Sequence, residues 1–153
     1  MQFAEFLGQV IERLKLPGAA PAADARNLEI SLKTGQTISL SLLDDDATCS
    51  VSALVGFYPE EAKLRPLFEF LLAMHAFGYG TRGAMFGVDM EASKIFMFRT
   101  FPMANIDLDG FTLALHHFIE AHRTWLEAYQ SGRLMEIVAQ GTAALLGPSA
   151  SRA

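Results

Sequence analysis

The side chains best suited to catalysis or metal binding are four histidines and one cysteine, and their spacing favours neither use. His116, His117 and His122 lie one and five residues apart, so no two of them form the i, i+4 pair that places both imidazoles on one face of a helix. Cys49 lies in the strand-like segment TCSVSAL, without the helix N-terminus that would activate a thiolate. We therefore expect no metal, no cofactor and no Cys–His dyad, and we interpret Cys49 and His122 as core residues.

Two other motifs have the composition of ligand sites but the wrong arrangement. The run Asp44-Asp45-Asp46 lacks the alternating ligands, central glycine and distal glutamate of a calcium loop, so we interpret it as a solvated turn. The glycines of FGYGTRG (77–83) follow an expected helix and precede a strand, the reverse of a phosphate-binding loop, and no Gly-Lys-Ser/Thr follows. They predict a helix end and a turn. We expect a protein that is not an enzyme.

Composition restricts the class of protein and of partner. Of the 153 residues, 51% are hydrophobic and only 19% are charged, which predicts one domain with a real core and favours buried self-association. The net charge is −5 and Lys and Arg form no cluster, so we expect no nucleic-acid partner. No run of about 18 apolar residues is present, and the start MQFAEFLGQVIERLK lacks a basic leader and a cleavage site, so we expect no membrane association and a cytoplasmic protein.

Four segments have the apolar spacing of helices. Residues 2–16 form an amphipathic helix, and residues 66–77 (PLFEFLLAMHAF) form an almost wholly apolar one. A long helix begins at an aspartate cap, Asp107 or Asp109, and ends near the QSG that follows Tyr129. Residues 134–146 form one more short helix before a tail of small residues.

Five segments predict strands. Residues 28–32 and 38–42 alternate apolar with polar residues around a Thr-Gly-Gln turn, which indicates a hairpin with one wet face. Residues 48–55 supply a third antiparallel strand. Residues 85–89 and 94–101 form a second strand pair, and the latter strand, KIFMFRTF, is apolar on both faces, as is typical of a central or interface strand.

Strands grouped in antiparallel runs indicate an α+β fold, one curved antiparallel sheet packed with helices in the order helix, three strands, helix, two strands, helix. We expect a single domain over residues 1–130 and a C-terminal extension over 131–153, which consists of a short helix and a disordered tail.

The apolar helix predicted at 66–77 is the main indication of function. Its apolar side chains spread over roughly 200° of the circumference, more than one core needs, which favours cover on two sides. The second cover would be another protein, most simply a second copy of the chain. The alternative is a central helix buried in one core, and the pattern alone leaves both open.

Six segments together carry a family pattern over residues 3–130. They are FLGQVIERLKL, LEISL, ISLSL, LFEFLLAMHAF, GAMFGVDMEASKIFMFRTFP and IDLDGFTLALHHFIEAHRTWLEAY. In this order the chain resembles the class I type III secretion chaperones, the Tir-chaperone-like family. Two positions depart from that family: Val88 precedes Asp89 where leucine is usual, and His75 lies near a common asparagine.

The resemblance implies a small acidic homodimer in the bacterial cytoplasm. Such a protein binds the N-terminal chaperone-binding segment of one or more secreted effectors and holds it extended without ATP. It then delivers the effector to the secretion apparatus, whose ATPase is a further partner. The alternative is a dimeric adaptor or regulatory module of the same fold that binds a folded partner and no effector.

The resemblance also implies two sets of site residues. The family's dimer contacts involve the second helix and neighbouring strands, which here are Leu67, Phe68, Leu71, Leu72, Met74, Phe96 and Phe98. Its effector grooves involve the first helix and first strands, which here are Phe3, Phe6, Val10, Leu28, Ile30, Ile38 and Leu40. Several residues of the second set must instead belong to the core.

Overall fold

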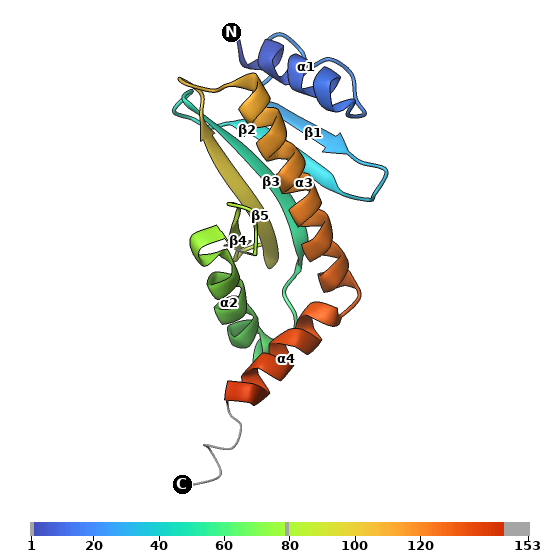
Figure 1. Cartoon of the computed structure of the whole chain (residues 1–153), viewed down its shortest axis with the longest axis vertical. Helices are drawn as coiled ribbons and strands as arrows, with labels where there is room; N and C mark the ends of the chain where they lie inside the picture. The colour runs from blue at the N-terminus through green and yellow to red at the C-terminus, as the bar shows by residue number, and fades with distance from the viewer. Residues whose placement is uncertain (1, 79, 146–153) are drawn as a thin grey trace, which may run out of the picture.

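The fold is built on one antiparallel sheet of five strands in the order β1-β2-β3-β5-β4 (Figure 1). The computed structural model describes residues 2–78 and 80–145. The strands are β1 (Asn27–Ser31), β2 (Thr37–Leu42), β3 (Thr48–Phe57), β4 (Met85–Asp89) and β5 (Lys94–Pro102). The helices are α1 (Phe3–Leu14), α2 (Glu61–His75), the 3-10 turn η1 (Ala76–Gly78), α3 (Leu108–Gln130) and α4 (Arg133–Leu145). The predicted α+β fold class is confirmed.

Side chains alternate between the two faces of a strand, so a strand can bury one face and leave the other accessible. In this sheet one face forms the floor of the core. On β3 the buried residues are Cys49, Val51, Ala53 and Val55, while the residues between them are only half-buried. The register aligns one apolar row across all five strands: Ile30, Ile38, Ala53, Met97 and Phe86. Every predicted strand is present, and each lies within two residues of its predicted bounds.

The helices α1 and α3 cover this face over β1, β2 and β3 (Figure 1). The ring of Phe6 on α1 meets Phe111 on α3 edge to face at 4.9 Å, and Phe111 meets Phe101 of β5 at 4.8 Å. At the start of α3, the carboxylate of Asp107 accepts a hydrogen bond from the backbone N–H of Gly110 at 2.9 Å. Asp107 is therefore the N-cap of this helix.

The other end of the sheet is covered by α2 and α4, which pack on each other (Figure 1). Leu134 and Val138 of α4 are buried in the same core as the sheet residues, so residues beyond 130 contribute to that core. The predicted short helix agrees with α4 as far as Leu145, and residues 146–153 lie outside the described residues. No helix in the described part of the chain is long and apolar enough to cross a membrane.

The bounds of α2 differ from the prediction. The helix begins at Glu61, and Pro66 lies inside it. The carbonyl that Pro66 leaves without a donor belongs to Ala62, an exposed residue of the first turn, so water can satisfy it. The helix ends at His75 because Phe77 adopts a positive φ of 61°, which breaks the helical path.

Candidate functional site

Cys49 is a buried residue of β3. Its side chain has no exposed surface, and burial raises the pKa of the thiol to about 12. The thiolate, which is the nucleophilic form, is therefore scarce at neutral pH. The structure thus confirms the interpretation of Cys49 as a small buried hydrophobe.

His122 belongs to a buried hydrogen-bond network that joins α3 to the sheet. Its Nε2 lies 2.8 Å from the carbonyl oxygen of Leu54, and its Nδ1 lies 2.8 Å from the amide nitrogen of Gln36. The same amide nitrogen donates to the carbonyl of Ile119 at 2.9 Å. Burial lowers the pKa of His122, so the neutral form with the proton on Nε2 fits both contacts. His122 is a hydrogen-bonded core histidine, as predicted.

The remaining polar motifs also have local structural partners. The carboxylate of Asp45 accepts hydrogen bonds from the backbone N–H groups of Ala47 and Thr48 at 3.0 and 2.9 Å, and the Thr48 hydroxyl lowers its pKa. His75 accepts the backbone N–H of Phe86 at 2.8 Å on Nδ1, and the two rings stack. Among the described residues, no three His, Cys, Asp or Glu side chains form a group that could hold a metal ion.

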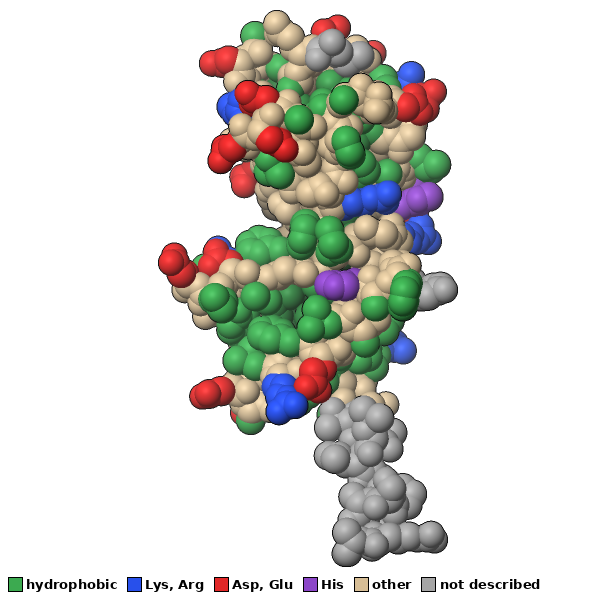
Figure 2. All heavy atoms as spheres, turned by 90° about the vertical axis from the view of Figure 1, so that its left-hand side faces the viewer, with side chains coloured by type: hydrophobic (Ala, Val, Ile, Leu, Met, Phe, Trp, Pro, Cys, Tyr) green, Lys and Arg blue, Asp and Glu red, His purple; other side chains and the backbone are tan. Residues whose placement is uncertain are grey.

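Apolar side chains are exposed where α2 meets the edge strand β4. We call this region, made of Phe68 and Leu72 from α2 with Val88 from β4 and Met90 after it, the α2–β4 surface. Leu72 is 59% exposed, Val88 46% and Met90 80%. Figure 2 shows hydrophobic side chains gathered around a hollow on the lower half of this side of the molecule.

Two apolar hollows flank β4. The first has a volume of about 170 Å³ and is lined by Phe68, Leu71, Leu72, Phe86, Gly87, Val88 and Ile95. The second, about 360 Å³, lies on the outer face of the sheet and is lined by Ser50, Ser52, Gly87, Val88, Asp89, Phe96 and Phe98. A monomer gains nothing by leaving apolar hollows open to water, so this side has the character of an interaction surface.

The residues predicted for the dimer interface occupy three different places. Leu67 and Leu71 are buried in the monomer core, with 0% and 3% of their surface exposed. Leu71 also lines the first hollow, but both residues offer almost no area to a partner. Phe68 and Leu72 line the first hollow, and Phe96 and Phe98 line the second. Met74 faces α3 and α4 instead. Residues four apart lie on the same face of a helix. The pair Leu67 and Leu71, the pair Phe68 and Leu72, and Met74 therefore point in three different directions from α2.

Most residues predicted for the effector groove are core residues of the monomer. Those fully buried between α1 and the sheet are Phe6, Val10, Ile30, Ile38 and Leu40. Phe3 and Leu28 are half-buried and retain accessible surface. The apolar face of α1 packs on the apolar face of the β1–β2 hairpin, so the two faces bury each other.

The free side of β1 is an unpaired sheet edge, because β1 pairs only with β2 among the described strands. The backbone N–H of Leu42 donates to the carbonyl of Arg26, and that of Leu32 donates to Gln36. Hydrogen-bonded positions alternate in an antiparallel pair, so even-numbered residues of β1 face β2. The N–H and C=O groups of Asn27, Glu29 and Ser31 therefore point outward.

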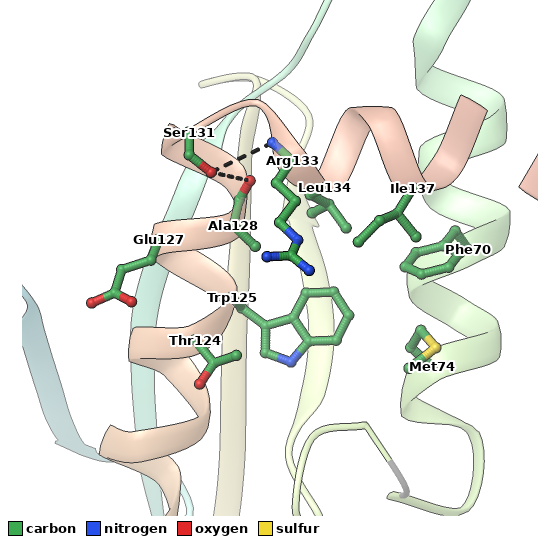
Figure 3. Close-up of a pocket in the computed structure, with 10 residues that line it drawn as sticks. All are labelled: Phe70, Met74, Thr124, Trp125, Glu127, Ala128, Ser131, Arg133, Leu134 and Ile137. Atoms are coloured by element: carbon green, nitrogen blue, oxygen red, sulfur yellow. Dashed lines mark hydrogen bonds between the residues drawn. The ribbon is translucent and has the colours of Figure 1, made fainter. Parts of the chain in front are cut away.

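Sequence reasoning missed a third surface, a cleft between α2, α3 and α4 with a volume of about 760 Å³ (Figure 3). It is lined by Phe70, Met74, Thr124, Trp125, Glu127, Ala128, Ser131, Arg133, Leu134 and Ile137. These residues come from α2 and from the distant pair α3 and α4 with the turn between them, so no local pattern indicates them. The one available signal was the pair of apolar residues Phe70 and Met74, one turn apart on α2.

The fold is similar to that of several solved structures whose sequences have low identity to this chain. The chaperone–effector complex HopA1–SchA matches with a TM-score of 0.62 and 13% identity over 82% of this chain and 94% of that chain. The complex ExoU–SpcU from the type III secretion system of Pseudomonas aeruginosa matches with a TM-score of 0.61 and 15% identity over 85% and 95%. YbjN from E. coli, a proposed transcription regulator, matches with a TM-score of 0.60 and 17% identity over 83% and 91%.

The sequence itself matches no protein-family model and no curated protein sequence. The structural similarity therefore concerns the fold, and the fold is also that of a protein described as a regulator. The resemblance seen in the sequence is confirmed at this level: the chain has the fold of the type III secretion chaperones.

Proposed function

We propose that this chain is a type III secretion chaperone that binds the N-terminal segment of secreted effector proteins. In this proposal it acts in the bacterial cytoplasm without ATP or cofactor and holds the segment extended. The secretion apparatus, with its ATPase, receives the complex. The observation that carries the proposal is the unpaired outer edge of β1, on a fold found in chaperone–effector complexes.

The β1 edge suits an extended segment of an effector. Its outward N–H and C=O groups at Asn27, Glu29 and Ser31 offer main-chain hydrogen bonds that do not depend on effector sequence. Leu28 on β1 is half-buried and supplies apolar contact at this edge, and Phe3 on α1 is the other predicted groove residue that keeps accessible surface. Such main-chain recognition allows one chaperone to bind segments of different sequence.

The α2–β4 side suits a second copy of the chain. Phe68 and Leu72 are accessible beside one hollow, and Phe96 and Phe98 beside the other. A twofold axis through this side would bring each patch onto the same patch of the partner, as in most homodimers. The proposed homodimer interface therefore contains these four residues and excludes the buried Leu67 and Leu71.

Co-expression with a candidate effector tests the proposal. We expect a stable complex in which an N-terminal effector segment of some tens of residues survives limited proteolysis. Glu29→Pro removes an outward-facing N–H of β1 and should weaken this protection, whereas the matched control Glu29→Ala keeps that N–H and should not. Cleavage of the effector segment at its free rate in the wild-type complex would contradict the chaperone proposal.

A second candidate is a dimeric adaptor or regulatory module that binds a folded partner. The similarity in fold to YbjN favours it. This candidate predicts a complex in which no unfolded segment is protected and in which Glu29→Pro has no effect. The same proteolysis experiment therefore separates the two functions.

A further inference from the structure

The cleft between α2, α3 and α4 is distinct from the surfaces used in the proposed function. On α2 it is lined by Phe70 and Met74, which lie roughly 160° around the helix axis from Phe68 and Leu72. Its volume of about 760 Å³ falls within the usual range for small-molecule sites.

The floor of the cleft is the indole of Trp125. Its ring meets Phe86 edge to face at 4.9 Å and Phe70 at 6.4 Å, and its Nε1–H donates to the carbonyl of Gly80 at 2.9 Å. The ring is therefore held in place with its polar atom satisfied. What it presents to the cleft is hydrocarbon.

The walls are apolar and the rim is polar. Met74 and Phe70 form one wall and Leu134 and Ile137 the other, as Figure 3 shows. On the rim, the Thr124 hydroxyl donates to the carbonyl of Glu120, the Ser131 hydroxyl donates to that of Ala128, and Glu127 lies 3.6 Å from Arg123.

Arg133 is the exception among the polar groups of the rim. Within the described residues its guanidinium forms no ion pair or side-chain hydrogen bond. In Figure 3 its side chain extends from the start of α4 into the cleft toward Trp125. A single unpaired cation over an apolar floor is complementary to one anionic group attached to an apolar body.

We propose that this cleft binds a long-chain carboxylate, with the carboxylate on Arg133 and the alkyl chain over Trp125. A guanidinium pairs with a carboxylate through two parallel N–H···O bonds, and one cation balances one negative charge. The flexible side chain of Met74 can adapt to an alkyl chain of variable shape. The lining comes from α2, α3, α4 and the turn at Ser131 and includes no strand residue, so the cleft lacks the free strand edge that an extended polypeptide needs.

Trp125 is the single tryptophan of the chain, so its fluorescence reports directly on the cleft. We expect dodecanoate, titrated below its micelle concentration, to change the Trp125 emission in a saturable way. Dodecanol, which has the same chain and no charge, should bind about tenfold more weakly. Arg133→Gln should abolish this preference, whereas Arg65→Gln on α2, whose side chain is exposed and does not line the cleft, should retain it.

The exposed Ile137 provides a second variant that keeps the fold. Ile137→Glu places a carboxylate on the wall and should eliminate the dodecanoate response while the circular dichroism stays unchanged. An unresponsive Trp125, or an equal affinity for dodecanoate and dodecanol in the wild type, would overturn the proposal. So would a change in the sedimentation coefficient of Ile137→Glu, because the cleft would then be filled by a second copy.

Discussion

The two ends of the sheet carry similar apolar residues, but the chain's own helices bury them at one end and leave several exposed at the other. At the α1–α3 end, Phe6, Val10 and Ile38 are fully buried by the chain's own helices. At the α2–β4 end, Leu72, Val88 and Met90 remain exposed beside open hollows (Figure 2). An apolar pattern therefore predicts that a residue will be buried, but not whether its own chain or a partner buries it.

The difference arises from how much of the apolar surface of α1 and of α2 the monomer can bury. The helix α1 has one apolar face and lays it on the sheet. The helix α2 has apolar residues in three directions, and the core takes only the one that carries Leu67 and Leu71. The remaining two directions face the α2–β4 surface and the cleft beside α4, so α2 is the element on which both proposed sites depend.

The largest effect is expected at the closed end. Phe6→Ala should lower the free energy of unfolding by about 3–5 kcal/mol, because it removes a fully buried ring packed on Phe111 and leaves a cavity. Urea denaturation measures this change. Leu113→Ala, on the exposed side of α3, is the control and should change stability by less than about 0.5 kcal/mol. Equal effects of the two substitutions would show that the α1–α3 end is not closed.

The next effect concerns association at the open end. Leu72→Asp should leave the monomer folded and weaken the proposed homodimer by about 2 kcal/mol or more, a factor of about 30 in Kd. Sedimentation velocity measures the dissociation. Leu113→Asp is a matched control, since Leu113 is 57% exposed and lies on another helix. A wild-type protein that stays monomeric at high concentration would contradict the homodimer.

A smaller effect is expected from pH at the junction of α3 and the sheet. Burial lowers the pKa of His122, so below about pH 6.5 the unfolded chain binds a proton that the folded chain does not. Stability should therefore fall as the pH is lowered, with a slope of at most about 1.4 kcal/mol per pH unit from this residue.

Denaturation between pH 7 and pH 5 measures that slope. It should be absent in His122→Gln and present in His116→Gln, because His116 is exposed on the same helix. A wild-type slope that survives in His122→Gln would assign the pH dependence to another group.

The smallest effect is expected on the outward side of α2. Arg65 Nε lies 2.8 Å from the Glu69 carboxylate, but both side chains are largely in water. Arg65→Ala should leave the denaturation midpoint and the dimer unchanged within error, since exposed ion pairs contribute little. Loss of the dimer in this variant would place the interface on the wrong side of α2.

Local patterns were sufficient to predict the elements. The alternation at LEISL and ISLSL places the hairpin correctly, and the Asp107 cap places the start of α3. The prediction failed at the start of α2, because Pro66 looks like a first-turn residue and the five residues before it carry no apolar pattern of their own. The buried role of Gln36 was also invisible, since its partners, His122 and Ile119, lie more than 80 residues away along the chain.

The proposed sites were harder to predict because they depend on distances between elements. The alternation that identifies Ile30, Ile38 and Leu40 as apolar is the same for a groove and for a core. The position of α1 over the hairpin decided between them. Likewise Trp125 on α3 and Phe70 on α2 are far apart in the chain and become neighbours only in the folded molecule.

The sequence by itself determined the secondary structure, the fold class and the excess of apolar surface, because these follow from periods and compositions that are local to each segment. Only the tertiary structure decided which apolar residues are core and which line the hollows beside β4. It also decided that the Arg133 guanidinium, which has no charged partner among the described residues, extends toward Trp125. The physical reason is that burial and charge pairing are properties of neighbours in space. In this chain many of those neighbours come from elements far apart in the sequence, such as α2 and α3.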